Sequence, residues 1–216
     1  MALRWVLLAA LMLVSGGAAA EAPPSSDMGI PMLMRGGAGG SGILPTDPSL
    51  KPFRRPICGG SVHCRHGISV RLKMPNGPDY VVENSFGGPD VYQGAVFIFP
   101  GETLSVEADA GSDGPTNLSY VEAAEHPDRT LTLTFEQAAD VEGGYGMRLT
   151  ATNPFARAVR FNVLTLEPSG RSQYGPINCG VPAHGSLQQK WLFPVWQAVI
   201  AKLTFVSDES VAACAP

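Results

Sequence analysis

The sequence of this chain predicts an all-β fold, built as one antiparallel β-sandwich. Short segments in which apolar and polar residues alternate recur along its second half. Glycine and proline, 25 and 19 of the 216 residues, are spread between these segments and provide turns. Long runs with apolar residues at helical spacing are scarce. Many short strands with frequent turn signals are typical of a sandwich.

The clearest strand signal is residues 129–136, RTLTLTFE, where Leu131, Leu133 and Phe135 alternate with polar residues. Because successive side chains of a strand point to opposite faces, this pattern predicts a half-buried strand with threonines on the wet face. Further strands are predicted at residues 68–72, 91–99, 103–108, 146–152, 159–166 and 199–206. Seven to nine such strands predict an immunoglobulin-like or similar sandwich, with a small barrel as the alternative.

Evidence for helices is thin. Residues 187–201 are the longest helix candidate, and residues 119–125 and 137–141 have room for about one turn each. Pro194 lies inside the longest candidate, and proline lacks the N–H that a helix interior needs.

Residues 1–20, MALRWVLLAALMLVSGGAAA, match the pattern of a secretory signal peptide. Arg4 gives a basic start, residues 5–14 are an unbroken apolar run, and residues 18–20 are alanines that a signal peptidase accepts. The run is far shorter than the roughly 20 residues that span a bilayer, although an uncleaved anchor is the alternative. We therefore expect a periplasmic or extracellular protein with no membrane span after cleavage, and the alanine-rich signal favours a bacterial source.

The rest of the chain divides by composition. Residues 21–56 are rich in glycine, proline and serine and are predicted to form a flexible segment. Residues 57–216 are predicted to form the β-sandwich domain and are numerous enough for a core of their own. Cleavage after Ala20 leaves 14 basic and 19 acidic side chains, a net charge of −5. Nucleic-acid binding needs clustered basic residues, so this class of partner is not expected.

Four cysteines lie in the predicted mature chain, at Cys58, Cys64, Cys179 and Cys214. An even number in an exported protein predicts disulfides, and four cysteines allow three pairings. The pairing Cys58–Cys64 and Cys179–Cys214 is favoured because Gly59-Gly60 would make the first loop easy to close.

The stretch PICGGSVHCRH, residues 56–66, also raises the question of a metal site. Its donors would be Cys58, His63, Cys64 and His66, with Cys179 and His184 as additional ligands. The Cys-x5-Cys spacing is longer than the Cys-x2–4-Cys spacing typical of zinc ligands. Neighbours such as His63 and Cys64 would also point to opposite faces of a strand. We therefore predict no metal and no cofactor.

Catalysis has little support in the sequence. No Gly-x-Ser-x-Gly elbow is present, and the histidine and serine of residues 180–186 fit a surface loop. The alternative is a secreted hydrolase with an acidic cleft, for which Glu122, Glu125 and Glu136 are the candidates. No catalytic residue is assigned, and an enzyme is the less favoured interpretation.

The densest aromatic stretch is KWLFPVW, residues 190–196. Aromatic residues are usually buried in a core, and that is the main interpretation of this stretch. Trp191 and Trp196, with Tyr174 as a helper, are the candidates if the stretch instead binds a ligand. The sequence thus predicts an exported, non-catalytic binding or structural protein of unknown ligand, whose partner is a protein or a glycan. The specific alternative is a carbohydrate-binding module that uses Trp191 and Trp196.

Overall fold

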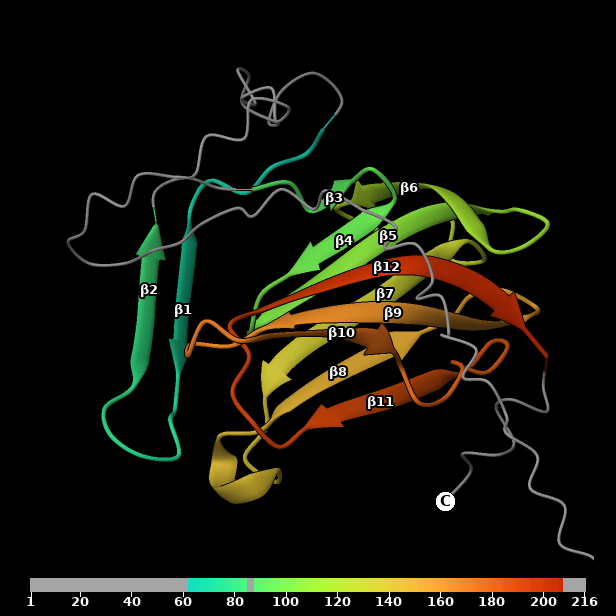
Figure 1. The fold of residues 1–216 in the computed structure, drawn as a ribbon. Coiled ribbons are helices and arrows are strands. Elements are labelled where there is room, and N and C mark those ends of the chain that lie inside the picture. Colours follow the sequence, from blue (N-terminus) through green and yellow to red (C-terminus); the bar gives the residue numbers. More distant parts are fainter. Residues whose placement is uncertain (1–61, 85–87, 208–216) are drawn as a thin grey trace, which may run out of the picture. The chain divides into compact units, whose positions relative to one another are not determined.

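A computed structural model describes residues 62–84 and 88–207. Two five-stranded antiparallel sheets pack face to face (Figure 1), which confirms the predicted β-sandwich. Neither sheet closes on itself in these residues, so the small-barrel alternative is wrong. The predicted signal peptide, residues 1–20, and the predicted flexible segment, residues 21–56, lie outside the described residues.

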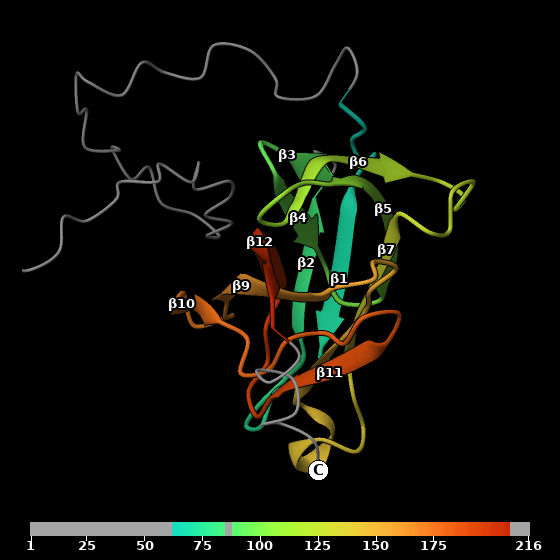
Figure 2. The same cartoon turned by 90° about the vertical axis from the view of Figure 1, so that its right-hand side faces the viewer.

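Each edge strand of one sheet lies on the same side of the sandwich as an edge strand of the other sheet. The first has the order β10-β9-β12-β4-β3, with β3 at Val91–Tyr92, β4 at Ala95–Ile98, β9 at Ala158–Leu166, β10 at Ser172–Pro176 and β12 at Gln197–Val206. The second has the order β11-β8-β7-β5-β6, with β5 at Glu102–Ala110, β6 at Pro115–Val121, β7 at Thr130–Gln137, β8 at Met147–Thr152 and β11 at Ser186–Trp191. Edge strand β3 contacts edge strand β6, and β10 and β11 are the edges on the other side (Figure 2).

A separate hairpin adds to the core. It consists of β1, Ile68–Leu72, and β2, Tyr80–Asn84. Ile68, Val70 and Leu72 alternate with exposed residues and are at most 7% exposed, so one face of β1 is buried. The only helical turn in the described residues is a short 3-10 helix at Glu142–Gly144 between β7 and β8. No helix formed by these residues has the length and apolar character needed to cross a membrane.

The core follows the predicted alternation. Leu131, Leu133 and Phe135 of β7 are at most 2% exposed, and Phe161 and Val163 of β9 are buried in the same alternating way. Each such side chain contributes about 1.5–3 kcal/mol on burial. Hydrophobic burial on the inner faces therefore holds the two sheets together.

Two local predictions were wrong. The helix candidate at residues 187–201 instead forms β11, a connection that contains Pro194, and the first half of β12. Its apolar residues suit a strand at the sheet centre, since Gln197–Ile200 is buried throughout. The single strand predicted at residues 91–99 is a hairpin, in which Gln93 and Gly94 adopt φ of +49° and +74°. Positive φ at both central residues is the requirement of a two-residue hairpin turn.

A buried amide anchors the segment that follows β10. Asn153 is 1% exposed, and its Nδ2 donates to the carbonyls of Arg157, Val181 and Pro182 at 2.8, 3.3 and 2.9 Å. Its Oδ1 accepts the backbone N–H of Phe155 at 3.0 Å. The amide satisfies four backbone groups and so fixes the 181–182 region against the turn between β8 and β9.

The turn between β5 and β6 reaches across to β12. The N–H of Phe205 donates to the carbonyl of Asp113 at 2.7 Å. A Cβ at Gly114 would lie 2.2 Å from the carbonyl oxygen of Leu203, so only glycine fits there. This close approach ties the second sheet to the first.

The substitution Gly114→Ala is expected to lower the free energy of unfolding by about 1–3 kcal/mol, because the methyl group forces β12 away from the turn. Gly88→Ala is the control, since a Cβ there meets nothing within 4 Å. Urea denaturation of both variants measures the difference. Equal stability of the two variants would contradict this account of the joint.

Candidate functional site

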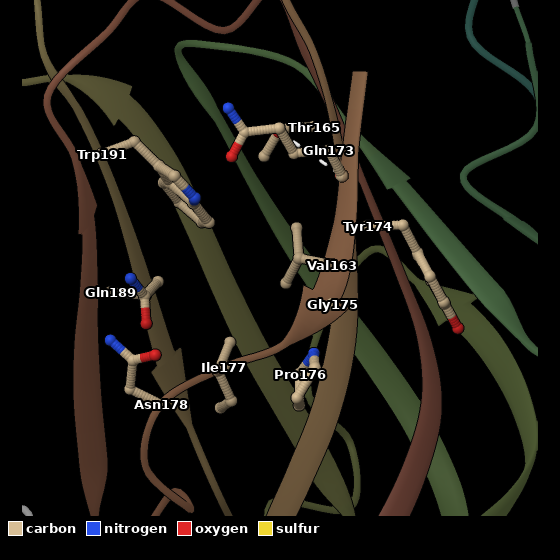
Figure 3. Close-up of a pocket in the computed structure, with 10 residues that line it drawn as sticks. All are labelled: Val163, Thr165, Gln173, Tyr174, Gly175, Pro176, Ile177, Asn178, Gln189 and Trp191. Atoms are coloured by element: carbon tan, nitrogen blue, oxygen red, sulfur yellow. Dashed lines mark hydrogen bonds between the residues drawn. The ribbon is translucent and has the colours of Figure 1, made fainter. Parts of the chain in front are cut away.

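A cleft opens between the edge strands β10 and β11, as Figure 3 shows. It has a volume of about 180 Å³. Its lining residues are Val163, Thr165, Gln173, Tyr174, Gly175, Pro176, Ile177, Asn178, Gln189 and Trp191. The cleft exists because the two edges do not cover each other: Leu187, Gln189 and Trp191 face inward from β11 but are only half-buried.

The cleft has an apolar floor and amide walls. Val163 and Ile177 on the floor are 5% and 4% exposed. Gln173, Asn178 and Gln189 point their amide groups toward the gap from three different segments (Figure 3). None of the ten lining residues carries a charged side chain, so the cleft offers neutral hydrogen-bonding groups beside apolar surface.

Trp191 forms a fixed aromatic wall of the cleft. Its ring packs edge-to-face on Phe135, with centroids 6.1 Å apart and an interplanar angle of 90°. Phe135 is fully buried, so this contact anchors the half-buried indole to the core. On the same strand, Nε2 of Gln189 donates to the carbonyl of Lys190 at 3.0 Å, and its amide oxygen is directed toward the cleft region.

Tyr174 borders the cleft, but its ring points away from Trp191 (Figure 3). The register pairs Tyr174 with Leu164, so its side chain lies on the outer face of the sheet. There its hydroxyl accepts a hydrogen bond from Asn162 at 2.8 Å, and the Lys202 ammonium lies 6.0 Å from its ring centroid. The side chain is 47% exposed.

Trp196 is not among the cleft-lining residues. Its ring contacts Phe99, with centroids 6.0 Å apart, and its backbone N–H donates to Leu166 at 2.9 Å. Strand β11 ends at Trp191, so the alternation that would relate the two tryptophans stops there. Of the three aromatic residues that the sequence suggested for one ligand site, Trp191 and Tyr174 line the cleft and Trp196 does not.

The end of the PICGGSVHCRH stretch pairs with the chain before β3. Cys64 forms an isolated β-bridge with Pro89. Neither Cys64 nor Cys179 is a free thiol, whereas Cys58 and Cys214 lie outside the described residues. Over residues 62–84 and 88–207, no group of three or more His, Cys, Asp or Glu side chains is arranged to hold a metal ion.

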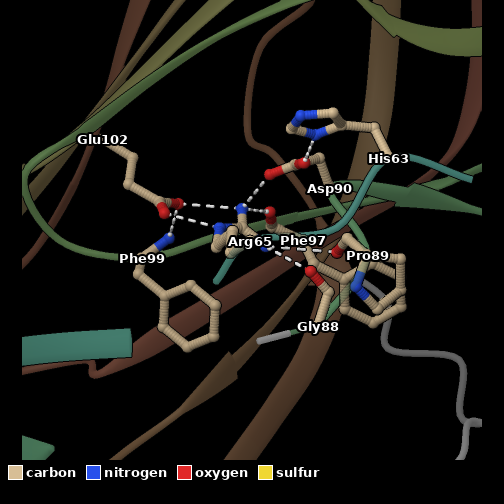
Figure 4. A network of polar contacts seen from close by, with 8 residues as sticks. All are labelled: His63, Arg65, Gly88, Pro89, Asp90, Phe97, Phe99 and Glu102. Carbon is tan, nitrogen blue, oxygen red and sulfur yellow. Dashed lines mark hydrogen bonds and ion pairs between the residues drawn. The ribbon is translucent and has the colours of Figure 1, made fainter. Parts of the chain in front are cut away.

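Arg65, next to that cysteine, is the centre of a buried polar cluster (Figure 4). Its guanidinium contacts both carboxylate oxygens of Glu102 at 2.5 and 2.9 Å and a carboxylate oxygen of Asp90 at 2.9 Å. It also donates to the carbonyls of Phe97 at 2.5 Å and Pro89 at 3.1 Å. The side chains of Arg65 and Asp90 are 9% and 2% exposed, so these charges depend on each other for compensation.

His63 extends the cluster to β6. Its Nδ1 contacts the carboxylate of Asp90, and its ring stacks on Tyr120 with centroids 4.1 Å apart. Burial, and then the negative charge of Asp90, raise the pKa of the Tyr120 hydroxyl above its usual value. The Arg65 cluster thus joins the residues just before β3 to β4, β5 and β6, which places it at the packed edge of the sandwich.

The acids suggested for a hydrolase do not line the cleft. Glu122 and Glu125 are exposed in the connection after β6. Glu136 accepts hydrogen bonds from Arg148 at 2.7 and 3.0 Å, and Arg148 also pairs with Asp140 at 3.2 Å. A hydrogen bond from its own backbone N–H, followed by the charge of Arg148, lowers the pKa of Asp140. The lowered pKa favours the ionised form of Asp140, whereas a general acid needs a raised pKa.

The carboxylate of Glu107, on the outer face of β5, is also held in ion pairs. His126 contacts its carboxylate at 2.8 Å and Arg129 at 3.0 Å. The hydrogen bond with His126 is the main cause that lowers the pKa of Glu107. Glu107, Glu136 and Asp140 therefore belong to ion pairs around β5, β7 and β8.

Comparisons with known proteins give this chain no family. No protein-family model matches it, and no curated protein or solved structure is significantly similar to it. The chemistry of the cleft is consequently the main guide to function.

Arg65→Met is expected to lower the free energy of unfolding by about 3–5 kcal/mol, because it leaves the Asp90 carboxylate buried without its partner. The double variant Arg65→Met/Asp90→Asn should lose less free energy of unfolding than the sum of the losses in Arg65→Met and Asp90→Asn alone. Arg71→Met is the control, since Arg71 is 69% exposed and its ion pair with Asp79 is 3.8 Å long. Urea denaturation of the four variants measures this coupling, and a loss in Arg65→Met no larger than in Arg71→Met would contradict it.

Proposed function

We propose that this chain is an exported, non-catalytic binding protein that holds its ligand in the cleft between β10 and β11. The observation that carries this proposal is the lining itself: amide groups and an anchored indole around an apolar floor, with no charged side chain. Small-ligand sites are concave and combine apolar side chains with convergent polar groups. In this cleft the polar groups provide most of the accessible lining.

Binding is favoured over catalysis because the cleft lacks the groups that chemistry requires. General acid–base catalysis uses a histidine, carboxylate, lysine, tyrosine or cysteine within hydrogen-bonding reach of the substrate. The only such side chain in the lining is Tyr174, and its ring points away from the gap. A secreted hydrolase with an acidic cleft finds no support at this position.

Export and disulfides complete the proposal. The signal-like residues 1–20 favour the periplasm or the extracellular space, where disulfides persist. Neither Cys64 nor Cys179 is a free thiol, which supports disulfides without choosing their partners. The pairing of Cys64 with Cys58 and of Cys179 with Cys214 rests on the short Cys58–Cys64 spacing, in which Gly59-Gly60 makes the loop easy to close. The excess of acidic side chains argues against nucleic acid as the partner.

A cleft-filling variant tests the binding site. Gly175 lines the cleft, and a Cβ there meets nothing within 4 Å, so Gly175→Leu should fold and occupy the cleft. At a ligand concentration of 100 times Kd, a true ligand stabilises the wild type by about 2.7 kcal/mol. Thermal melting with panels of neutral glycans, charged glycans and extended peptides should reveal a ligand that stabilises the wild type and not Gly175→Leu. Trp196→Phe, which leaves every lining residue unchanged, should behave as wild type. If no compound acts, or if the variant responds equally, the cleft is not the binding site.

The disulfide pairing has a direct test. The intact mass of the purified mature protein should be lower by four hydrogens than the mass calculated for free thiols, and reductant should restore them. Peptide mapping without reduction should link Cys58 to Cys64 and Cys179 to Cys214. A mass that matches four free thiols would refute the disulfides, and other linked peptides would refute this pairing.

A further inference from the structure

We infer that the ligand of the cleft is a neutral sugar ring, stacked on Trp191 and hydrogen-bonded by Gln173, Asn178 and Gln189. This inference rests on the proposed function, since it names the ligand class of the same site. It differs from a platform of two tryptophans, because Trp196 packs on Phe99 outside the cleft.

The indole supplies the apolar half of this recognition. A sugar ring presents C–H groups on its faces, and an aromatic surface matches such a face. Edge-to-face contact with the buried Phe135 holds the indole in place before any ligand arrives. A fixed aromatic ring costs less conformational entropy on binding than a mobile one.

The amides supply the polar half. Each primary amide has two N–H donors and a carbonyl acceptor, and each sugar hydroxyl both donates and accepts. Gln173 belongs to β10, Asn178 follows that strand, and Gln189 belongs to β11. Because the three amides come from both walls of the cleft, they can contact hydroxyls around the circumference of one ring.

The uncharged lining disfavours ligands that carry a charge. A charged group that leaves water needs a partner of opposite sign, and none of the lining side chains supplies one. Lys190, between Gln189 and Trp191, is exposed, and its ammonium lies 3.5 Å from Asp140. Uronic acids, sulfated sugars and phosphates therefore fit this cleft poorly.

Size and edge structure favour a single ring over a peptide strand. The volume of about 180 Å³ is below the roughly 300–1,000 Å³ of sites that enclose drug-sized ligands. The cleft therefore accepts one ring while the rest of a glycan stays outside. An extended peptide would add to an edge strand, but Pro176 at the end of β10 lacks the N–H that such pairing uses.

The experiment is calorimetric titration of the mature protein with neutral oligosaccharides of glucose, galactose, mannose, xylose and N-acetylglucosamine. Matched uronic and sulfated oligosaccharides and extended peptides are titrated in parallel. At least one neutral glycan should bind, and its charged counterpart should bind at least about tenfold more weakly, a difference of about 1.4 kcal/mol. Binding should also change the tryptophan fluorescence. Trp196→Phe should retain this change, because it comes from Trp191.

Variants locate the contacts. Trp191→Ala should weaken glycan binding at least about tenfold, and Gln173→Leu and Gln189→Leu about three- to tenfold each. Because Trp191 touches the core, the two glutamine variants keep the test valid if Trp191→Ala fails to fold. Trp196→Phe is the control and should bind as wild type does, because Trp196 is not a lining residue.

The outcomes separate the two proposals. Glycan binding that is insensitive to Gln173→Leu and Gln189→Leu overturns the sugar assignment of this cleft. Binding of peptides or charged sugars alone, lost in Gly175→Leu, overturns the ligand class and leaves the binding function standing. No binding by any member of the three panels overturns both.

Discussion

The Arg65 guanidinium is the contact on which one side of the sandwich depends. It occupies its donors with Asp90, Glu102 and the carbonyls of Pro89 and Phe97, at a position where its side chain is 9% exposed. Removing any member leaves a buried charge or carbonyl unsatisfied, and such groups are costly. Residues 63–65, which include Cys64, are thereby joined to the sandwich. His63 and Arg65 serve structure in this cluster.

The space between the two sheets is filled differently at the two edges of the sandwich. On the side of β3 and β6, the Arg65 cluster and the stacking of His63 on Tyr120 fill the space between the sheets. On the side of β10 and β11, no comparable polar cluster lies among the cleft-lining residues, and the inward side chains of β11 are half-buried. Polar groups therefore fill one edge of the sandwich, and the cleft opens at the other edge.

Local patterns explain how far the sequence could predict this molecule. Alternation in residues 129–136 specifies a strand and its buried face, because both depend on neighbours two residues apart. The partners of Arg65 lie up to 37 residues away, and no local pattern encodes that pairing. Trp191 was singled out as an aromatic residue, whereas Gln173, Asn178 and Gln189 were missed because polar residues at scattered positions form no motif. Tyr174 lines the same cleft as Trp191 although its ring points away, and Trp196 is not among the lining residues. Strand register and the end of β11 decide where these two rings point, and no local pattern encodes either.

The uncharged lining of the cleft has a thermodynamic consequence for any neutral ligand held there. None of the side chains that point into the gap changes protonation between mildly acidic and mildly alkaline solution. Binding would then exchange no protons with the medium and displace no counterions. Its affinity would be nearly constant across pH and ionic strength, the two variables that fluctuate most outside the cytoplasm.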